Sequence, residues 1–298
     1  MAQVTFDPED HLYPTSPGRA SGRACPEKGD TIDGVSARPN HARPPVPDPA
    51  AQRRCYSAGR LHESDLAPTW VAQFARWYEQ ASAVAAEPGS ALPEPNAMVF
   101  ATADTRGRPS ARTVLLKGFD ERGFTLFTNL GSRKAREAAA NPYGSLVFPW
   151  HALQRQIVAV GGLEEVSRAE TAAYFRSRPR GSQLGAWTSR QSEVIGSRDW
   201  LDRRWAELDA RWPAPEPVPV PAFWGGIRLV PETVEFWQGG PDRLHDRLRY
   251  RRIDADDTPA DTSADEVRAG EPRSGEPGTG EHGQSHADGR WIVERLSP

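Results

Sequence analysis

RTVLLKGFDERGFTLFTNLGSRK, residues 112–134, has the pattern of two strands joined by a tight turn and followed by the start of a helix. Side chains alternate over 112–119, so Thr113, Leu115 and Lys117 are expected to share one face. The residues DERG at 120–123 predict a turn, and 124–128 is expected to return as the partner strand. A hairpin this apolar is expected to be half buried.

The end of this segment carries a candidate anion site. Ser132 is expected to cap a helix over 132–140, which ends before Asn141 and Pro142. Free backbone N–H groups at a helix start, beside Arg133 and Lys134, can hold a phosphate dianion. An isolated Ser-Arg-Lys is more often a solvated first turn, so the interpretation depends on the rest of the chain.

The remaining pattern predicts a mainly β fold with flanking helices. Short apolar segments predict further strands of an antiparallel sheet or barrel at 97–103, 145–150, 156–166, 223–230, 233–237 and 291–296. A helix is predicted from Pro68 to about 78, with an aromatic face for packing. Another is predicted over 197–212, and its expected core anchors are Trp200, Leu201, Trp205, Leu208 and Trp212.

Composition divides the 298 residues unevenly. The chain is 37% hydrophobic, with 28 Pro and 26 Gly, and the mean hydropathy is -0.66. Residues 1–50 and 254–289 are rich in Pro, Gly and charge without periodicity, which predicts a disordered N-terminal arm and a disordered acidic insertion. The folded domain is therefore expected at 51–253 together with 290–298.

Charge and cysteine content exclude several classes of function. A net charge of -3 and a pI near 6.2 give no basic surface for nucleic acid or an anionic membrane. Cys25 and Cys55 are the only cysteines, too few for a disulfide framework or a Cys-based metal site. His282 and His286 lie in a glycine-broken acidic stretch, so we expect no metal. The start of the chain lacks a signal-peptide pattern, and a cytoplasmic protein is expected.

A second group of polar side chains follows a capping box at Ser167 and Glu170. The capping box predicts a helix to about residue 177, on which Tyr174 and Arg178 point the same way. With Ser182 just beyond, a phenol, a guanidinium and a hydroxyl could hold another phosphate. An ordinary helix end with a dipole-favoured arginine is the commoner situation for such a pair.

Arg243, His245 and Arg247 alternate near the end of the folded part. In an extended segment they would share one face, and such a row is costly to bury unless it meets an anion or a polar ring. A lone histidine is usually structural, but one between two arginines on the same face is a better candidate for a site. Arg53 and Tyr56 belong to a small cationic and aromatic cluster that, alone, predicts only where the chain enters the fold.

Taken in order, these motifs resemble the pyridoxamine (pyridoxine) 5'-phosphate oxidase family. The resemblance covers about 53–250 and resumes at 291, and it is carried by RTVLLK, FTNLGSRK, FPWHALQRQ, YFRSRPRGSQLGAW, SRQS, FWGG, EFWQGGPDRLHDR and WIVERLSP. It implies an FMN-binding split β-barrel of antiparallel strands, working as a homodimer with FMN at the interface. One departure is Phe127, where the family commonly has tyrosine.

The resemblance also implies roles for individual residues. FMN contacts are implied for Arg112, Thr113, Val114, Leu115, Leu116, Lys117, Phe127, Thr128, Arg133, Lys134, Gln156, Gln191, Ser192, Trp237 and Arg247, some from the other subunit. Substrate contacts are implied for Arg53, Tyr56, Lys117, Tyr174, Arg178, Ser182, Arg243 and His245. The last two are also the expected catalytic residues, because they would face the substrate ring.

The implied reaction is oxidation of pyridoxamine or pyridoxine 5'-phosphate to pyridoxal 5'-phosphate, with O2 reduced to H2O2 and ammonia released from the amine. The two predicted phosphate sites agree with it, since both FMN and the substrate carry a phosphate. Two alternatives stay open at this stage. They are a split-barrel reductase using a flavin or deazaflavin, and a carrier of flavin or vitamin B6 phosphate without turnover.

Overall fold

The computed structural model describes residues 48–52, 55–253 and 290–298. The chain divides into two units, Met1–Cys55 and Tyr56–Pro298. The described part of the first unit contains only a short 3-10 turn, Pro49–Ala51. Most of the predicted N-terminal arm, the predicted insertion at 254–289, Arg53 and the pair His282 and His286 lie outside the described residues.

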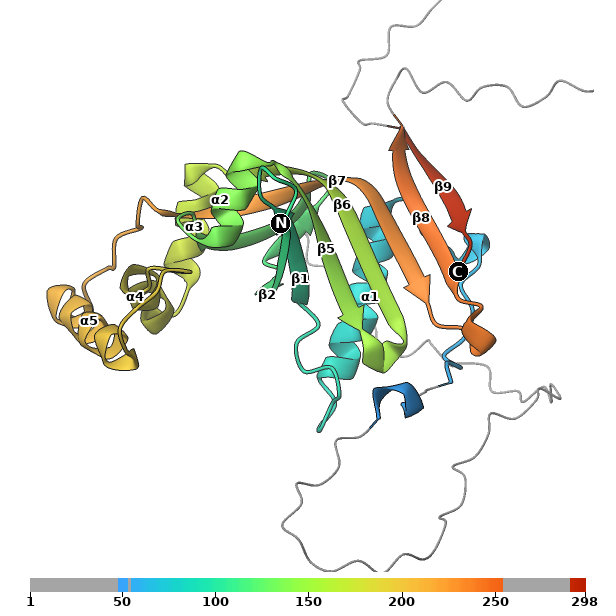
Figure 1. The fold of residues 1–298 in the computed structure, drawn as a ribbon, viewed down its shortest axis with the longest axis horizontal. Helices are drawn as coiled ribbons and strands as arrows, with labels where there is room; N and C mark the ends of the chain where they lie inside the picture. The colour runs from blue at the N-terminus through green and yellow to red at the C-terminus, as the bar shows by residue number, and fades with distance from the viewer. Residues whose placement is uncertain (1–47, 53–54, 254–289) are drawn as a thin grey trace, which may run out of the picture. The chain divides into compact units, whose positions relative to one another are not determined.

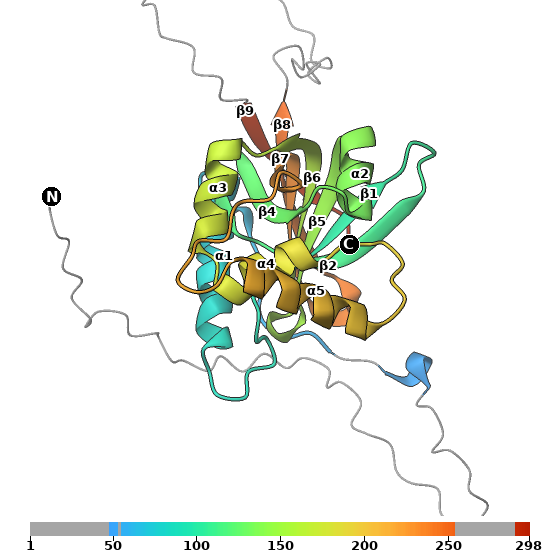
Figure 2. The same ribbon diagram turned by 90° about the vertical axis from the view of Figure 1, so that its left-hand side faces the viewer.

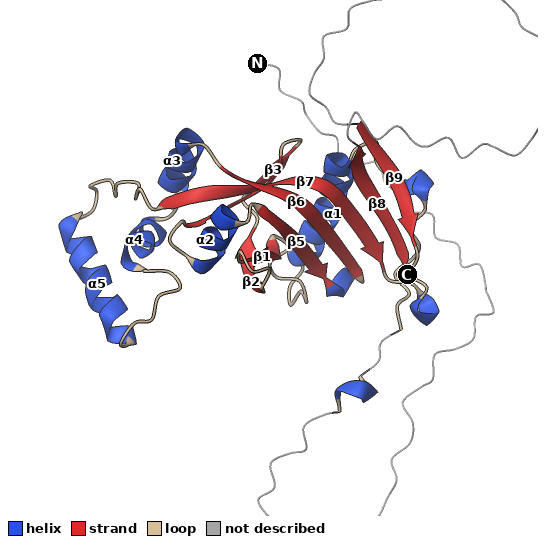
Figure 3. Ribbon diagram, turned by 45° about the horizontal axis from the view of Figure 1, so that its top comes forward, coloured by secondary structure: helices blue, strands red, loops and turns tan. Residues whose placement is uncertain are grey.

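The second unit is organised around one antiparallel sheet (Figures 1 and 3). Its nine described strands are β1 (Ala97–Ala103), β2 (Pro109–Leu115), β3 (Gly118–Asp120), β4 (Gly123–Asn129), β5 (Tyr143–Trp150), β6 (Arg155–Glu165), β7 (Trp224–Gln238), β8 (Asp246–Ile253) and β9 (Arg290–Leu296). The order is β2-β1-β5-β6-β7-β4-β3, and β8 pairs with both β7 and β9. The prediction of a mainly β, antiparallel fold is confirmed.

The predicted hairpin over 112–128 is wrong in its pairing. Arg112 lies opposite Phe100 in the β1–β2 ladder, and only β3 pairs with β4. Between them, the Leu116 N–H donates to the Asn96 carbonyl at 2.8 Å, and the Lys117 N–H donates to the Thr125 carbonyl at 2.9 Å. The segment 109–120 therefore runs from one end of the strand order to the other.

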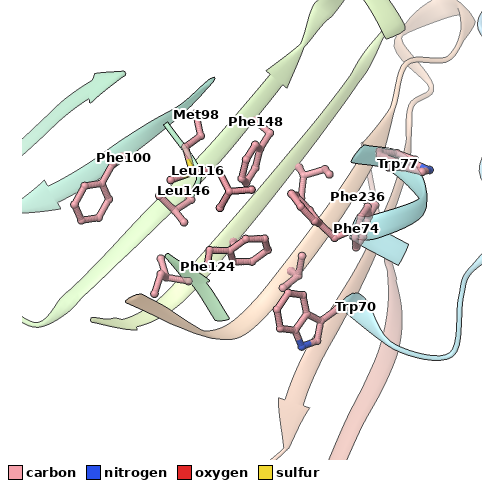
Figure 4. Close-up of a cluster of buried hydrophobic side chains, with 14 of the residues drawn as sticks. Trp70, Phe74, Trp77, Met98, Phe100, Leu116, Phe124, Leu146, Phe148 and Phe236 are labelled. Carbon is pink, nitrogen blue, oxygen red and sulfur yellow. The ribbon is translucent and has the colours of Figure 1, made fainter. Parts of the chain in front are cut away.

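Helix α1 (Trp70–Ala85) packs its aromatic face on the sheet. It begins two residues later than Pro68 suggested, because the Thr69 side chain accepts the Ala72 N–H and acts as the N-cap. Figure 4 shows Trp70, Phe74 and Trp77 beside the side chains of Phe124, Phe148 and Phe236 from the strands. The Phe74 ring lies 4.9 Å from Phe124 and 5.0 Å from Phe148, both edge to face, which is a favoured aromatic arrangement.

The two strands predicted at 223–230 and 233–237 form one strand, β7. An irregularity in its register with β6, between Val160 and Gly161, accommodates one extra residue on β7, Glu232. A Cβ at Gly161 would lie 2.1 Å from the Val230 carbonyl oxygen, so only glycine fits this close approach. β7 thus pairs with β4 near its start, with β6 along most of its length and with β8 near its end.

Four further helices lie toward the β2 and β4 side of the unit: α2 (Arg133–Ala140), α3 (Arg168–Ser177), α4 (Arg180–Thr188) and α5 (Arg198–Arg211) (Figure 2). The Ser167 cap of α3 is confirmed, since its side chain accepts the Glu170 N–H. Of the five predicted core anchors, Leu208 is buried and Trp212 packs against the same cluster, whereas the prediction is wrong for Trp205, which is 40% exposed. None of the helices described is long and apolar enough to cross a lipid bilayer.

Candidate functional site

A cavity of about 740 Å³ lies between β2, β4 and the helices α2 to α4. Many of the predicted FMN and substrate residues line it: Arg112, Thr113, Val114, Leu115, Lys117, Phe127, Thr128, Lys134, Tyr174, Arg178, Ser182 and Gln191. Four consecutive residues of β2, the strand at the end of the sheet order, line the cavity, and the end of β4 leads through a short turn into α2. We call this space the cofactor cavity.

Lys134 lies at the start of α2 and is 8% exposed. Its Nζ donates to Gln191 Oε1 at 2.8 Å and to Ser132 Oγ at 3.3 Å, both neutral oxygens. Burial, together with the nearby charge of Arg112, lowers the pKa of Lys134 to about 8. A buried ammonium without a carboxylate partner favours an incoming anion.

Arg112 lines the cavity but is largely engaged by the protein. One terminal nitrogen donates to the Phe100 carbonyl at 3.0 Å and to Thr102 Oγ1 at 2.7 Å. The other contacts Ser110 Oγ and lies 3.4 Å from Glu137 Oε2. These bonds fix the guanidinium in place and leave the Nε–H as its remaining donor.

Glu137 is a buried carboxylate behind this group. It accepts from Thr102 Oγ1 at 2.6 Å, from Ser110 Oγ and from Arg133 Nε at 2.7 Å. Burial alone would raise the pKa of Glu137, but the hydrogen bonds from Ser110, Thr102 and Arg133 outweigh it and lower the pKa to about 2. Glu137 therefore stays ionised. It orients Arg112 and Arg133, but not Lys134.

The loop after α4 reaches the same helix start. Gln191 accepts from Thr128 Oγ1 at 2.9 Å, in addition to its bond from Lys134. Ser192 Oγ accepts the Arg133 backbone N–H at 3.1 Å, and Ser192 has a positive φ of 75°. The structure thus brings Thr128, Arg133, Lys134, Gln191 and Ser192 together, as predicted.

Arg178 marks a second position for an anion in the cavity. One of its terminal nitrogens is buried and has no hydrogen-bond partner. Burial lowers the pKa of Arg178, although the guanidinium stays charged. A buried, charged donor left unpaired is costly, so this atom indicates a site for an anionic ligand. Tyr174, Ser182 and Lys117 line the same space.

Aromatic rings form one wall of the cavity. Phe127 stacks on Tyr174 with ring centres 4.2 Å apart, and on Trp224 with centres 5.4 Å apart. The Arg178 guanidinium lies over the Trp224 ring, with its central carbon 4.8 Å from the ring centre. Phe127 therefore contributes a stacking face, for which no hydroxyl is needed.

The other predicted site residues lie elsewhere. Leu116 is 5% exposed and belongs to the hydrophobic core, so its predicted contact with FMN is not made by its side chain. Gln156, Trp237 and Arg247 are register partners across β6, β7 and β8. Thr128 pairs with Gly225 near the start of β7, and Trp237 lies twelve residues farther along it, which corresponds to about 40 Å in an extended strand.

Tyr56, Trp237 and His245 pack together, and we call them the His245 cluster. The His245 ring centre is 4.7 Å from Trp237 and 5.7 Å from Tyr56. The Gly240 N–H donates to His245 Nδ1 at 3.1 Å. In the neutral imidazole the proton is therefore on Nε2, which can donate to a ligand.

The predicted row of Arg243, His245 and Arg247 on one strand face is wrong. Arg243 lies in the 3-10 turn Pro241–Arg243, where Asp242 and Arg243 have positive φ values of 52° and 65°. β8 begins only at Asp246. Arg247 is on the strand and pairs with Glu235 through two bonds of 2.7 and 2.9 Å, so this carboxylate already balances its charge.

Three residues near these groups, Glu137, Gln154 and Asp246, make hydrogen bonds that the sequence analysis did not predict. Glu137 is four residues beyond Arg133, a spacing typical of a helical ion pair, which was the available signal. Gln154 and Asp246 make their hydrogen bonds to the backbone of 57–61, far away in the sequence, for which the sequence holds no local signal. Among the described residues, no group of three His, Cys, Asp or Glu side chains is arranged to hold a metal.

Comparison with known proteins agrees with the geometry. Residues 86–211 match the family model described as pyridoxamine 5'-phosphate oxidase. Residues 224–298 match the pyridoxine 5'-phosphate oxidase C-terminal dimerisation region.

Two similar proteins are both described as pyridoxine/pyridoxamine 5'-phosphate oxidase. The one from Frankia alni is 58% identical over 264 residues, covering 89% of this chain and 95% of the relative. The one from Streptomyces avermitilis is 50% identical over 256 residues, covering 86% and 99%.

Two solved structures are also similar. PhzG from Burkholderia lata 383, in complex with tetrahydrophenazine-1-carboxylic acid, is 27% identical with a TM-score of 0.61, over 79% of this chain and 95% of that chain. A pyridoxamine 5'-phosphate oxidase-related, FMN-binding protein from Nostoc punctiforme shares the fold at 18% identity and a TM-score of 0.53, over 78% and 100%.

Proposed function

The chain belongs to the pyridoxamine 5'-phosphate oxidase family, and from this premise we propose that it completes its active site by pairing two copies. It is an FMN-dependent oxidase of pyridoxine and pyridoxamine 5'-phosphates. The observation that carries the assignment of this activity to the cofactor cavity is its two separate positions for an anion, at Lys134 and at Arg178. Two are needed because both FMN and the substrate bear a phosphate.

The residues at the start of α2 fit the phosphate of FMN. Lys134 would provide the principal charge, because its ammonium has only neutral partners. Arg112 would contribute its remaining Nε–H, and Arg133 can turn from Glu137 toward the ligand, as its side chain is 59% exposed. Thr128 and Gln191 would bind the ribityl chain. The backbone N–H groups at the helix start add to this anion site.

The substrate phosphate would bind at the other position. The unpaired Arg178 nitrogen supplies a charged donor, and Tyr174, Ser182 and Lys117 supply further donors from α3, α4 and the end of β2. A phosphate held here by its charge positions the rest of the substrate without a contact to the reacting carbon.

The His245 cluster would bind the substrate ring. His245 Nε2 donates a hydrogen bond while Nδ1 is held by the Gly240 N–H. Arg243, exposed on its turn, would face the same ring and accommodate its negative charge. Tyr56 and Trp237 supply flat surfaces beside it.

A second copy is needed because the two groups of residues are far apart in one chain. Figures 1 and 3 show α4 and α5 at one end of the sheet and β8 and β9 at the other. Two members of the His245 cluster, Trp237 and His245, lie within the part that matches the family's dimerisation region, which indicates a homodimer. In our proposal, the His245 cluster of one subunit faces the cofactor cavity of the other.

Bound in this cavity, FMN would supply the acceptor for the substrate's hydride, and O2 would then be reduced to H2O2. The chain's own residues orient both phosphates, supply the Nε2 proton donor at His245 and surround the ring with aromatic side chains. Stacked Phe127, Tyr174 and Trp224 give the cavity an aromatic wall.

The test uses the purified full chain. Its visible spectrum reports bound flavin, and pyridoxamine 5'-phosphate is then added in air while aldehyde and peroxide are followed. Equal amounts of both products support the oxidase. Bound flavin without turnover would support a reductase or a carrier, and a protein that takes up no FMN would contradict the assignment of the cofactor cavity.

A further inference from the structure

The segment 56–61 is attached to the sheet at two separate points. At its start, Gln154 Oε1 accepts the backbone N–H groups of Ser57 at 2.8 Å and of Ala58 at 3.0 Å. At its end, Asp246 Oδ2 accepts the Leu61 N–H at 3.1 Å and Arg60 Nε at 2.7 Å. The two attachments have different partners, so each can be removed separately.

Gln154 has an unusual backbone conformation for this contact. It follows the turn His151–Leu153 with φ 53° and ψ 38°, the left-handed region that non-glycine residues seldom occupy. Its carbonyl accepts the Gly239 N–H at 2.8 Å and Gln238 Nε2 at 3.2 Å. One residue therefore joins the segment 56–61 to the end of β7. A costly conformation retained at such a junction suggests a function.

The position of Tyr56 depends on this junction. Its ring lies edge-on to Trp237 and to His245, with both ring centres 5.7 Å away. Gly239 lies directly beneath the ring, since a Cβ there would come within 2.9 Å of Tyr56 Cγ. The ring is thus in contact with the end of β7, and the amides of the next two residues are held by Gln154.

We propose that Gln154 is a positioning residue, which acts through Tyr56 to shape the binding surface for the substrate ring. The inference rests on the proposed function, because it takes the His245 cluster as the surface that meets the substrate. Gln154 itself points its oxygen at the backbone, so it acts on the site only through the segment it holds.

The chain offers a test that separates positioning from folding. Gln154→Gly removes the acceptor and suits the left-handed backbone, so the turn and its carbonyl bonds are kept. Gln154→Glu keeps an oxygen acceptor at the same place and serves as the matched control. Asp246 still holds the far end of the segment in both variants.

We expect Gln154→Gly to raise the KM for pyridoxine 5'-phosphate about tenfold, the loss expected for two hydrogen bonds to a neutral amide. FMN affinity and the melting temperature should stay close to those of the wild type, and Gln154→Glu should restore the KM. In a Tyr56→Ala background, the same change should add no further increase, because both changes act through one side chain. Equal increases in KM with and without Tyr56 would overturn the proposal.

Amide hydrogen exchange gives a readout that does not depend on activity. The Ser57 and Ala58 amides should exchange faster in Gln154→Gly and remain protected in Gln154→Glu. Unchanged exchange would overturn the inference even if the enzyme is an oxidase. If instead the wild type shows no turnover, the proposed function fails, while the exchange rates still decide whether Gln154 holds the segment.

Discussion

Lys134 Nζ lies 2.8 Å from Gln191 Oε1, so a buried ammonium at the start of α2 is held by a neutral amide. Such a group is destabilising in the free protein and becomes favourable when an anion binds beside it. The same lysine should therefore have opposite effects on stability and on FMN affinity.

Lys134→Met tests this opposition. Removal of the charge should weaken FMN binding by about 10- to 100-fold, the range for a hydrogen bond to a charged group. The apoprotein should become more stable at pH 7, because the unfolded chain hydrates the ammonium better than the folded one does. Flavin titration and thermal unfolding measure the two effects, and a variant that loses stability while keeping its affinity for FMN would contradict the assignment.

FMN affinity should depend on pH through the same group. The pKa of Lys134 is lowered to about 8 in the free protein, and a bound phosphate raises it again. Binding is then accompanied by proton uptake above pH 8, so the affinity should fall by up to about tenfold per pH unit there. Fluorescence titrations from pH 7 to 10 measure the slope, which should be absent in Lys134→Met.

Arg178→Met tests the second anion position. Loss of the unpaired guanidinium should reduce kcat/KM for pyridoxine 5'-phosphate by about 10- to 100-fold and leave FMN affinity nearly unchanged. Arg176→Met is the matched control, since Arg176 is exposed on the same helix and does not line the cavity. If FMN binding is lost instead, the two phosphates have been assigned to the wrong positions.

Glu137→Gln should alter the response of stability to acid. The pKa of Glu137 is about 2 when folded and 4.5 at its ordinary value, so the unfolded chain binds more protons between these values. The stabilisation is complete above pH 4.5 and is lost as the pH falls toward 2. Denaturant unfolding from pH 6 to 3 should show a smaller decrease for Glu137→Gln than for the wild type. If the free energy of unfolding fell equally with pH in both proteins, the hydrogen bonds from Thr102, Ser110 and Arg133 would not stabilise the ionised carboxylate.

The sequence predicted most strands and the residues around Lys134, because alternation and the start of a helix are local patterns. Ser132 occupies the N-cap position of α2 as predicted, but its side chain makes no capping hydrogen bond and accepts from Lys134 Nζ instead. It predicted the wrong partner for Arg112, since alternation shows which residues share a face and not which strand lies opposite. The Arg243 row failed for another reason. Positive φ values at Asp242 and Arg243 end any extended conformation there, and non-glycine residues give little warning of them.

Tertiary contacts account for the rest of the difference. Trp205 has the spacing of a core residue on α5 and is nevertheless exposed, because the described part of the chain gives that face of the helix little to pack against. Gln154 and Asp246 have polar side chains of ordinary type. Both side chains accept backbone N–H groups of the segment 56–61. That segment lies more than ninety residues before each of them in the sequence, so no local pattern predicts the contacts.

The central claim is that each active site combines the cofactor cavity of one subunit with the His245 cluster of the other. The most direct test is a heterodimer that carries Arg178→Met in one subunit and His245→Ala in its partner, purified through two different tags. Only one of its two sites then contains both substitutions, and the other contains neither. We predict about half the wild-type kcat with a wild-type KM, although each variant homodimer is impaired. A heterodimer as impaired as the two homodimers would mean that each site is built within a single chain.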